Sequence, residues 1–481
     1  MNSAVNISRA FVHQFVDHDV GGNDPELHNP SEFAGVIPPP PELFGTLSGT
    51  AIHLAGGRPI LPTVSECAVH LELLQALYML RRRVLQSKDL DNSFEIVPHP
   101  KTVKQYTYSQ GRRTSFQKVK IKDATYVDRR KSKWPAFVDF AVMRFIHWVE
   151  IADAELLKGK NEGDDDVNLI VPPLDILMVW HSFLLNPRDF ESYCNPRRLH
   201  SIRSVLFPWK IIHESIDSQT WSFNLSEKYI TKFTTATGLD VDSIEFLTRN
   251  MIHPFVRSVV LRLSFRRTNP GPLDPVSKEP FQLSKRTLGF FSKCSKISDK
   301  ENSIQTIGAA VHRQSEFVDK MEKFLWIHSP GVSGTLRRAI DRYTKYLKLL
   351  KLYRGKILVP ENDIDLAWHT HQCSAARYQA DTIALVGVYV NHNDKLGRGV
   401  LRDQRNVTER YFRMRFGQEY HVCLCWECQL TLLEVEKLNQ TTVKESDIEV
   451  IAKRISSTAR SYRNAELWRR ACARAQLVDD D

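Results

Sequence analysis

Cysteine is scarce in this chain: eight occur among 481 residues, and only Cys423, Cys425 and Cys428 lie close together. This excludes the dense disulfide framework that stabilises small secreted domains. The N-terminus also lacks a basic region followed by an apolar one, because Asp17 and Asp19 come early. We therefore expect no signal peptide and a reduced, intracellular protein of the cytoplasm or nucleus, not a secreted one.

Long apolar runs are missing as well. No run approaches the roughly 18 residues that span a bilayer, so we expect no transmembrane segment. Hydrophobic residues make up 42% and charged residues 25% of the chain, which is typical of globular proteins. The net charge of +10 is compatible with an anionic partner but does not identify one.

Familiar catalytic motifs are absent from the sequence. It has no Gly-x-x-x-x-Gly-Lys phosphate loop, no Gly-x-Ser-x-Gly elbow and no His-Glu-x-x-His motif. The sequence thus discloses no reaction. An interaction or scaffold protein with a protein partner ranks above an enzyme.

Hydrophobic periodicity predicts a mainly α-helical chain. A helix over 67–85 is expected to be capped by Ser65, and a helix over 134–157 has Pro135 in its first turn. The predicted organisation is an extended arm over 1–65, a helical unit over 66–265, a linker over 266–308, a second helical unit over 309–430 and a basic helical segment over 431–481.

Two segments of the chain share one pattern. Leu169–His181 and Ile357–His369 each contain Val-Pro, Asp-Ile and Trp-His at identical offsets, without a gap. Each copy follows a long helical segment, which predicts two pseudo-repeats of a helix–loop–Val-Pro–helix unit. The matched candidate binding residues are Asp175, Trp180 and His181 in the first copy and Asp363, Trp368 and His369 in the second.

The second copy carries polar residues that suggest a metal site. Asp365 and His369 are four residues apart and share a helix face, whereas His371 points about 200° away from His369. His392 and Asp394 follow in a predicted turn. At most two or three of these five are expected to converge, as ligands of a divalent metal such as zinc. The alternative is a buried Trp-His-Asp hydrogen-bond network.

Asp363-Ile364-Asp365-Leu366-Ala367-Trp368-His369-Thr370-His371, with Tyr378 and His392-Asn393-Asp394 downstream, resembles the glycine-rich domain-containing protein-like family. The resemblance implies a helical domain of unknown function, found in plants and fungi, over residues 66–430. The first copy departs from the motif after His181, where Ser182-Phe183 replaces Thr-His. The glycine-rich tail of plant members is missing, since the chain has only 21 glycines.

Two further clusters carry chemistry. The spacing of His421, Cys423, Cys425 and Cys428 is that of a zinc knuckle, with buried free thiols as the alternative. Residues 101–133 contain eleven Lys and Arg interleaved with aromatic residues. That segment is either an RNA-binding surface or a solvated insertion.

Overall fold

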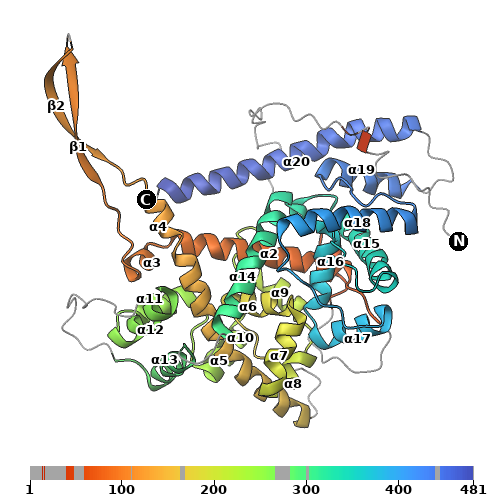
Figure 1. The fold of residues 1–481 in the computed structure, drawn as a ribbon, viewed down its shortest axis with the longest axis horizontal. Coiled ribbons are helices and arrows are strands. Elements are labelled where there is room, and N and C mark those ends of the chain that lie inside the picture. The colour runs from red at the N-terminus through yellow and green to blue at the C-terminus, as the bar shows by residue number, and fades with distance from the viewer. Residues whose placement is uncertain are drawn as a thin grey trace.

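The computed structural model describes residues 13, 14, 16, 39–47, 59–109, 111–162, 168–265, 282–298, 303–438 and 445–479. This part of the chain is mainly helical, as predicted (Figure 1). None of its helices is both long and apolar enough to cross a membrane. Most of the predicted N-terminal arm lies outside the described residues, although Pro41–Phe44 forms the short 3-10 helix η2 and buries Leu43.

The other elements follow in chain order. They are α2 (Val64–Gln86), α3 (Lys88–Ser93), β1 (Lys101–Ser109), β2 (Arg112–Ile121), α4 (Tyr126–Arg130), α5 (Lys133–Glu162), α6 (Leu174–Leu184), α7 (Pro187–Arg197), α8 (His200–Ser204), α9 (Trp209–Ser215), α10 (Glu227–Thr237), α11 (Ser243–Asn250), α12 (Pro254–Phe265), α13 (Lys285–Ser298), α14 (Ser303–Phe324), η3 (Trp326–His328), α15 (Val332–Leu352), α16 (Asn362–Gln372), α17 (Ala375–Val386), α18 (Arg398–Phe416), α19 (Trp426–Lys437) and α20 (Glu445–Asp479).

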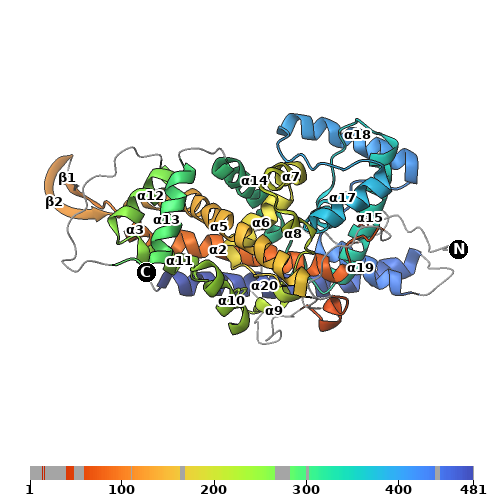
Figure 2. The ribbon, with the colours of Figure 1, turned by 90° about the horizontal axis from the view of Figure 1, so that it is seen from below.

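Helix α2 occupies the centre of the molecule (Figures 1 and 2). It packs against α5, α6 and α14 and also against α15 and α16, so the two predicted helical units share it. Its N-cap is Thr63 rather than the predicted Ser65. The Thr63 side chain accepts a hydrogen bond from the backbone N–H of Glu66, and the Glu66 carboxylate accepts one from Thr63. This reciprocal capping box satisfies two free N–H groups at once, which Ser65 inside the first turn cannot do.

The two copies of the sequence motif form similar helix pairs, α5 with α6 and α15 with α16. Trp180 on α6 packs against Trp148 at a ring distance of 5.2 Å, and Trp368 on α16 packs against Tyr346 at 5.4 Å. Both tryptophans are buried, as expected of residues on an apolar helix stripe.

Each helix pair also contains a buried ion pair. Arg144 on α5 contacts Asp175 on α6, and Arg342 on α15 contacts Asp363 on α16. The Nε–Oδ2 distance is 2.7 Å in both. The two ion pairs occupy matched positions of the sequence motif, and the duplication of the unit stays a prediction.

Helix α13 lies inside the segment predicted to be a linker. Its residues Phe290 and Phe291 are buried, and both rings pack near Phe246 of α11. The linker prediction over 266–308 is therefore wrong for this stretch. The prolines that suggested it lie at 270–280, before the helix and outside the described residues.

Residues 101–121 form an antiparallel hairpin that projects from the helical body (Figure 1). The β-branched and aromatic residues on both sides of Gly111 could have predicted it. Gly111 has φ +76°, a left-handed conformation that favours glycine at this turn.

Candidate metal centre

Helix α16 and the loop after α17 bring three predicted ligands together. Asp365 and His369 lie one turn apart on α16, and His392 approaches from residues 391–393. The Asp365 Oδ1 lies 3.2 Å from His369 Nε2 and 3.6 Å from His392 Nε2. The two Nε2 atoms are 3.2 Å apart. One carboxylate and two imidazoles thus form a small triangle of possible ligand atoms.

The triangle lies in an apolar setting. The Phe317 ring packs 4.5 Å from the His369 ring, and the Trp368 ring packs 5.0 Å from that of His392. The side chain of Asp365 is 19% exposed, compared with 2% for His369. Asp365 is thus the more exposed of the two, although its Oδ1 atom is itself buried.

Burial and the neighbouring charges shift the pKa of each group. Burial lowers the pKa of His369, against the opposing effect of Asp365. Burial also acts to lower the pKa of His392, but its contacts with Asp365 outweigh burial and raise it. Burial acts to raise the pKa of Asp365, yet the two histidines bring it far below the usual range. Carboxylate and neutral imidazole are the forms that bind metals.

The backbone of the first helix pair orients His392. Its Nδ1 lies 3.1 Å from the carbonyl oxygen of Leu185, which directly follows α6. A carbonyl only accepts hydrogen bonds, so Nδ1 carries a proton and Nε2 is the ring nitrogen that faces the triangle. Metal-binding histidines are commonly oriented in this way.

Two of the five predicted ligands lie apart from the triangle. His371 contacts the Tyr343 hydroxyl through Nδ1 and Asp381 through Nε2, both at 3.0 Å. It therefore projects away from His369, as helical geometry predicts. Asp394 forms an ion pair with Arg313 at 2.9 Å.

A second histidine pair, His70 on α2 and His181 on α6, lies where both helix pairs pack against α2. Thr370 donates its hydroxyl to the Leu366 carbonyl, so it accepts from His70 Nδ1 at 2.9 Å. The Nε2 of His70 is then an acceptor, and His181 Nε2 donates to it at 2.8 Å. Burial and the charge of His369 lower the pKa of His181 to about 3, so both rings are neutral at pH 7. Sequence reasoning missed His70 because it lies on α2, 300 positions from Thr370.

The candidate binding residues of the repeats are buried rather than displayed. Asp175, Trp180 and His181 are each 1% exposed, and Asp363, Trp368 and His369 are at most 4% exposed. These residues build the core, so a partner could not contact them on the surface.

Residues 251–381 match the family model described as glycine-rich domain-containing protein-like. This stretch is similar to that family. The match includes Asp365 and His369 but ends before His392. It confirms the resemblance inferred from the Asp-Ile-Asp and Trp-His-Thr-His residues. The family name states no reaction.

Two plant proteins from Arabidopsis thaliana are similar to the chain. Glycine-rich domain-containing protein 1 is 25% identical over 279 residues, which are 55% of this chain and 27% of that protein. Glycine-rich domain-containing protein 2 is 40% identical over 91 residues, which are 18% of this chain and 11% of that protein. The chain thus aligns with about a quarter or less of either relative. No solved structure matches it.

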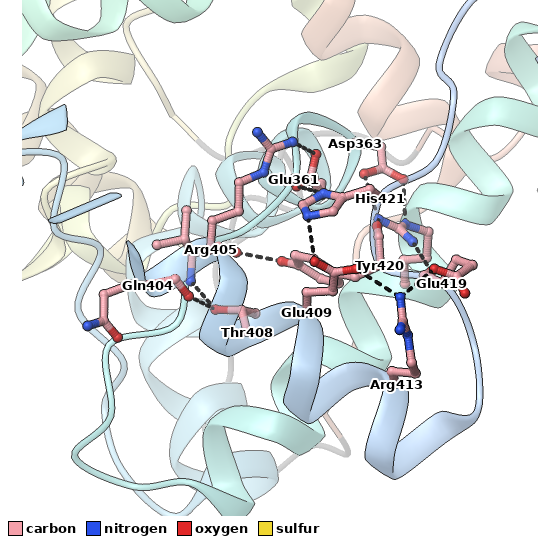
Figure 3. Close-up of polar contacts among 12 residues, drawn as sticks. Glu361, Asp363, Gln404, Arg405, Thr408, Glu409, Arg413, Glu419, Tyr420 and His421 are labelled. Carbon is pink, nitrogen blue, oxygen red and sulfur yellow. Dashed lines mark hydrogen bonds and ion pairs between the residues drawn. The ribbon is translucent and has the colours of Figure 1, made fainter. Parts of the chain in front are cut away.

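His421 lies outside the glycine-rich domain-containing protein-like match, and its ring contacts the carboxylates of Glu361 and Glu409 (Figure 3). Its Nδ1 contacts Glu361 at 2.8 Å and its Nε2 contacts Glu409 at 3.2 Å. Arg405 pairs with the same Glu361. Both ring nitrogens are therefore engaged by carboxylates, and the prediction that His421 completes the cysteine cluster is wrong.

Proposed function

We propose that this chain is a metal-binding helical interaction module. Its centre would hold one divalent transition metal through Asp365, His369 and His392. The observation that carries the proposal is the triangle of 3.2, 3.2 and 3.6 Å between single atoms of these side chains. Metal–ligand bonds of about 2.0–2.2 Å at tetrahedral angles place ligand atoms about 3.3–3.6 Å apart.

The site would join the two helix pairs. Asp365 and His369 come from α16, whereas His392 is held by the carbonyl of Leu185 at the end of α6. A metal bound here would oppose separation of α6 from α16. Two imidazoles and one carboxylate suit zinc or ferrous iron. Three protein ligands leave one position for water, so a metal-dependent enzyme is the alternative, but no observed group assigns a reaction.

The metal proposal predicts that Asp365→Ala removes one metal equivalent per chain. Asp365 contributes the charged ligand atom, and it is the most exposed of the three side chains, so its loss should spare the fold. Metal content is measured by plasma mass spectrometry on the purified full chain. The matched control is Asp394→Asn, which changes a nearby carboxylate bound to Arg313 and should keep the metal.

Thermal unfolding adds a second measure. Metal at about 100 times its Kd should stabilise the wild-type chain by about 2.7 kcal/mol through this site, and this gain should be missing in Asp365→Ala. Equal metal content in Asp365→Ala and Asp394→Asn would contradict the proposal.

The hairpin supports a second candidate function, the binding of single-stranded RNA. No acidic residue occurs between Lys101 and Lys122. Tyr106 pairs with Phe116 across the strands, and side chains alternate between the two faces of a hairpin. One face therefore carries both rings together with Lys104, Lys118 and Lys120.

Cations and rings on this face already contact one another. The Lys104 Nζ lies 4.7 Å above the Phe116 ring, and the Arg113 guanidinium lies 4.6 Å above that of Tyr106. Tyr106 and Phe116 remain 38% and 49% exposed. Exposed rings beside cations suit base stacking combined with phosphate contacts.

We expect Tyr106→Ala to weaken binding of a single-stranded RNA oligonucleotide by about 5- to 150-fold, because loss of a stacked base costs about 1–3 kcal/mol. Fluorescence anisotropy at several salt concentrations measures this change. Gln105→Ala, on the other face of the hairpin, is the control and should bind like the wild type. RNA binding that is equal in both variants, or absent from the wild type, would exclude this face of the hairpin as an RNA-binding surface.

A further inference from the structure

Three cysteines and a histidine from the opposite end of the sequence meet beside α19. The Sγ atoms of Cys423 and Cys425 are 3.3 Å apart, and His13 Nδ1 lies 3.3 Å from Cys428 Sγ. One ligand atom each of His13, Cys423 and Cys428 lies within 4.8 Å of the others. The cluster thus has four donors of the kind that bind zinc.

We propose that His13, Cys423, Cys425 and Cys428 form a second, structural zinc site that clamps the N-terminal segment onto α19 and α20. This site is separate from the Asp365–His369–His392 triangle and does not depend on it. Zinc would bind three thiolates and one imidazole, and the thiol protons would pass to solvent. Binding requires no oxidant or reductant.

The distances fit this assignment. Zinc–sulfur bonds of about 2.3 Å at tetrahedral angles place two sulfurs about 3.8 Å apart, and sulfur and nitrogen about 3.6 Å apart. The 3.3 Å separations in the structure need only a small opening to admit the ion. They are far longer than the roughly 2.05 Å of a disulfide bond.

The local backbone orders two of the ligands. Cys425 is the N-cap of α19, and its Sγ accepts a hydrogen bond from the Cys428 N–H at 3.4 Å. Residues at the cap and in the first turn of a helix project toward the same end of it. The Cys-x-x-Cys spacing at a helix start therefore presents both sulfurs to one ion.

An independent contact holds Val16, three residues after His13, at the same place. Val16 is 5% exposed and packs in an apolar cluster with Cys428, Leu432 and Val435 of α19 and Ile448 and Ala452 of α20. Residues 13 and 16 thus reach α19 through a ligand and through an apolar anchor. A zinc ion would fix this contact across 415 positions of sequence.

The proposal predicts different effects for two histidines. His13→Ala should weaken zinc binding at this site by at least about tenfold, since even residues that only orient a metal ligand contribute about 10- to 100-fold. His421→Ala should leave the affinity unchanged, because Glu361 and Glu409 occupy its nitrogens. Affinity is measured on the full chain by competition with a chromogenic chelator. His13 is exposed, so its replacement should not unfold the body.

Cobalt(II) distinguishes this site from the Asp365 triangle. Cobalt bound here should show a thiolate-to-metal charge-transfer band that Cys423→Ser abolishes and Asp365→Ala preserves. Removing the metal with a chelator should also raise hydrogen exchange at Val16. The proposal would be overturned if the wild-type chain binds no metal through thiolate. It would also be overturned by a Cys423–Cys425 disulfide in a chain purified under reducing conditions. A third contradicting result is a loss of zinc affinity in His421→Ala but not in His13→Ala.

Discussion

Asp363→Ala is expected to lower the free energy of unfolding by about 3–5 kcal/mol. The Asp363 and Arg342 side chains are 3% and 2% exposed, and their Nε–Oδ2 distance is 2.7 Å. Removal of the carboxylate would leave the guanidinium buried, with the Tyr420 carbonyl at 2.7 Å as a remaining acceptor. A buried charge without its partner pays the desolvation cost without the attraction. Chemical denaturation followed by circular dichroism measures the loss.

The control for this prediction is an exposed ion pair. Lys453 and Glu449 on α20 are 71% and 46% exposed, so Glu449→Ala should cost less than about 1 kcal/mol. Asp175→Ala should resemble Asp363→Ala, because Arg144 and Asp175 form the matched buried pair. A loss at Asp363 no larger than that at Glu449 would show that the pair is not buried in solution.

Trp180→Ala and Trp368→Ala are each expected to cost about 3–5 kcal/mol, because each would open a large cavity in the core. Replacement by phenylalanine separates the two sites. The Trp368 Nε1 donates to the Tyr378 hydroxyl at 2.8 Å, whereas the buried Trp180 Nε1 has no hydrogen-bond partner among the described residues. Trp368→Phe should therefore cost about 0.5–1.5 kcal/mol more than Trp180→Phe.

The same unfolding measurements test this difference. If Trp180→Phe proves the costlier change, hydrogen bonding does not distinguish the two tryptophans. If Trp368→Ala leaves the stability unchanged, Trp368 is not a core residue, and the similarity of the two helix pairs loses its support.

Local patterns predicted the mainly helical class, because helical periodicity depends on neighbours three and four residues apart. The predicted helix over 134–157 lies within α5, and Pro135 falls in its first turn. In the second copy of the motif, α16 ends at Gln372 and α17 begins at Ala375. Ile364 and Tyr378 therefore lie on different helices.

In two segments the local sequence signals favour different structures, and tertiary contacts decide which structure forms. Residues 101–121 are rich in lysine and arginine, yet their β-branched and aromatic residues pair across Gly111. The nearby prolines favoured a linker at the position of helix α13. Burial of Phe290 and Phe291 nevertheless makes this helix part of the core. Composition describes such segments poorly, because packing elsewhere in the chain selects their structure.

The sequence by itself determined the helical class, the family resemblance and the shared face of Asp365 and His369. It also determined that His371 points away from them, because all of these depend on short spacings along one chain segment. Only the tertiary structure decided which distant residues complete each site. His392 joins His369 across 23 positions, His70 lies 300 positions from Thr370, and His13 reaches Cys428 across 415. Contacts at such separations come from the packing of whole helices, which leaves no periodic signal in the sequence.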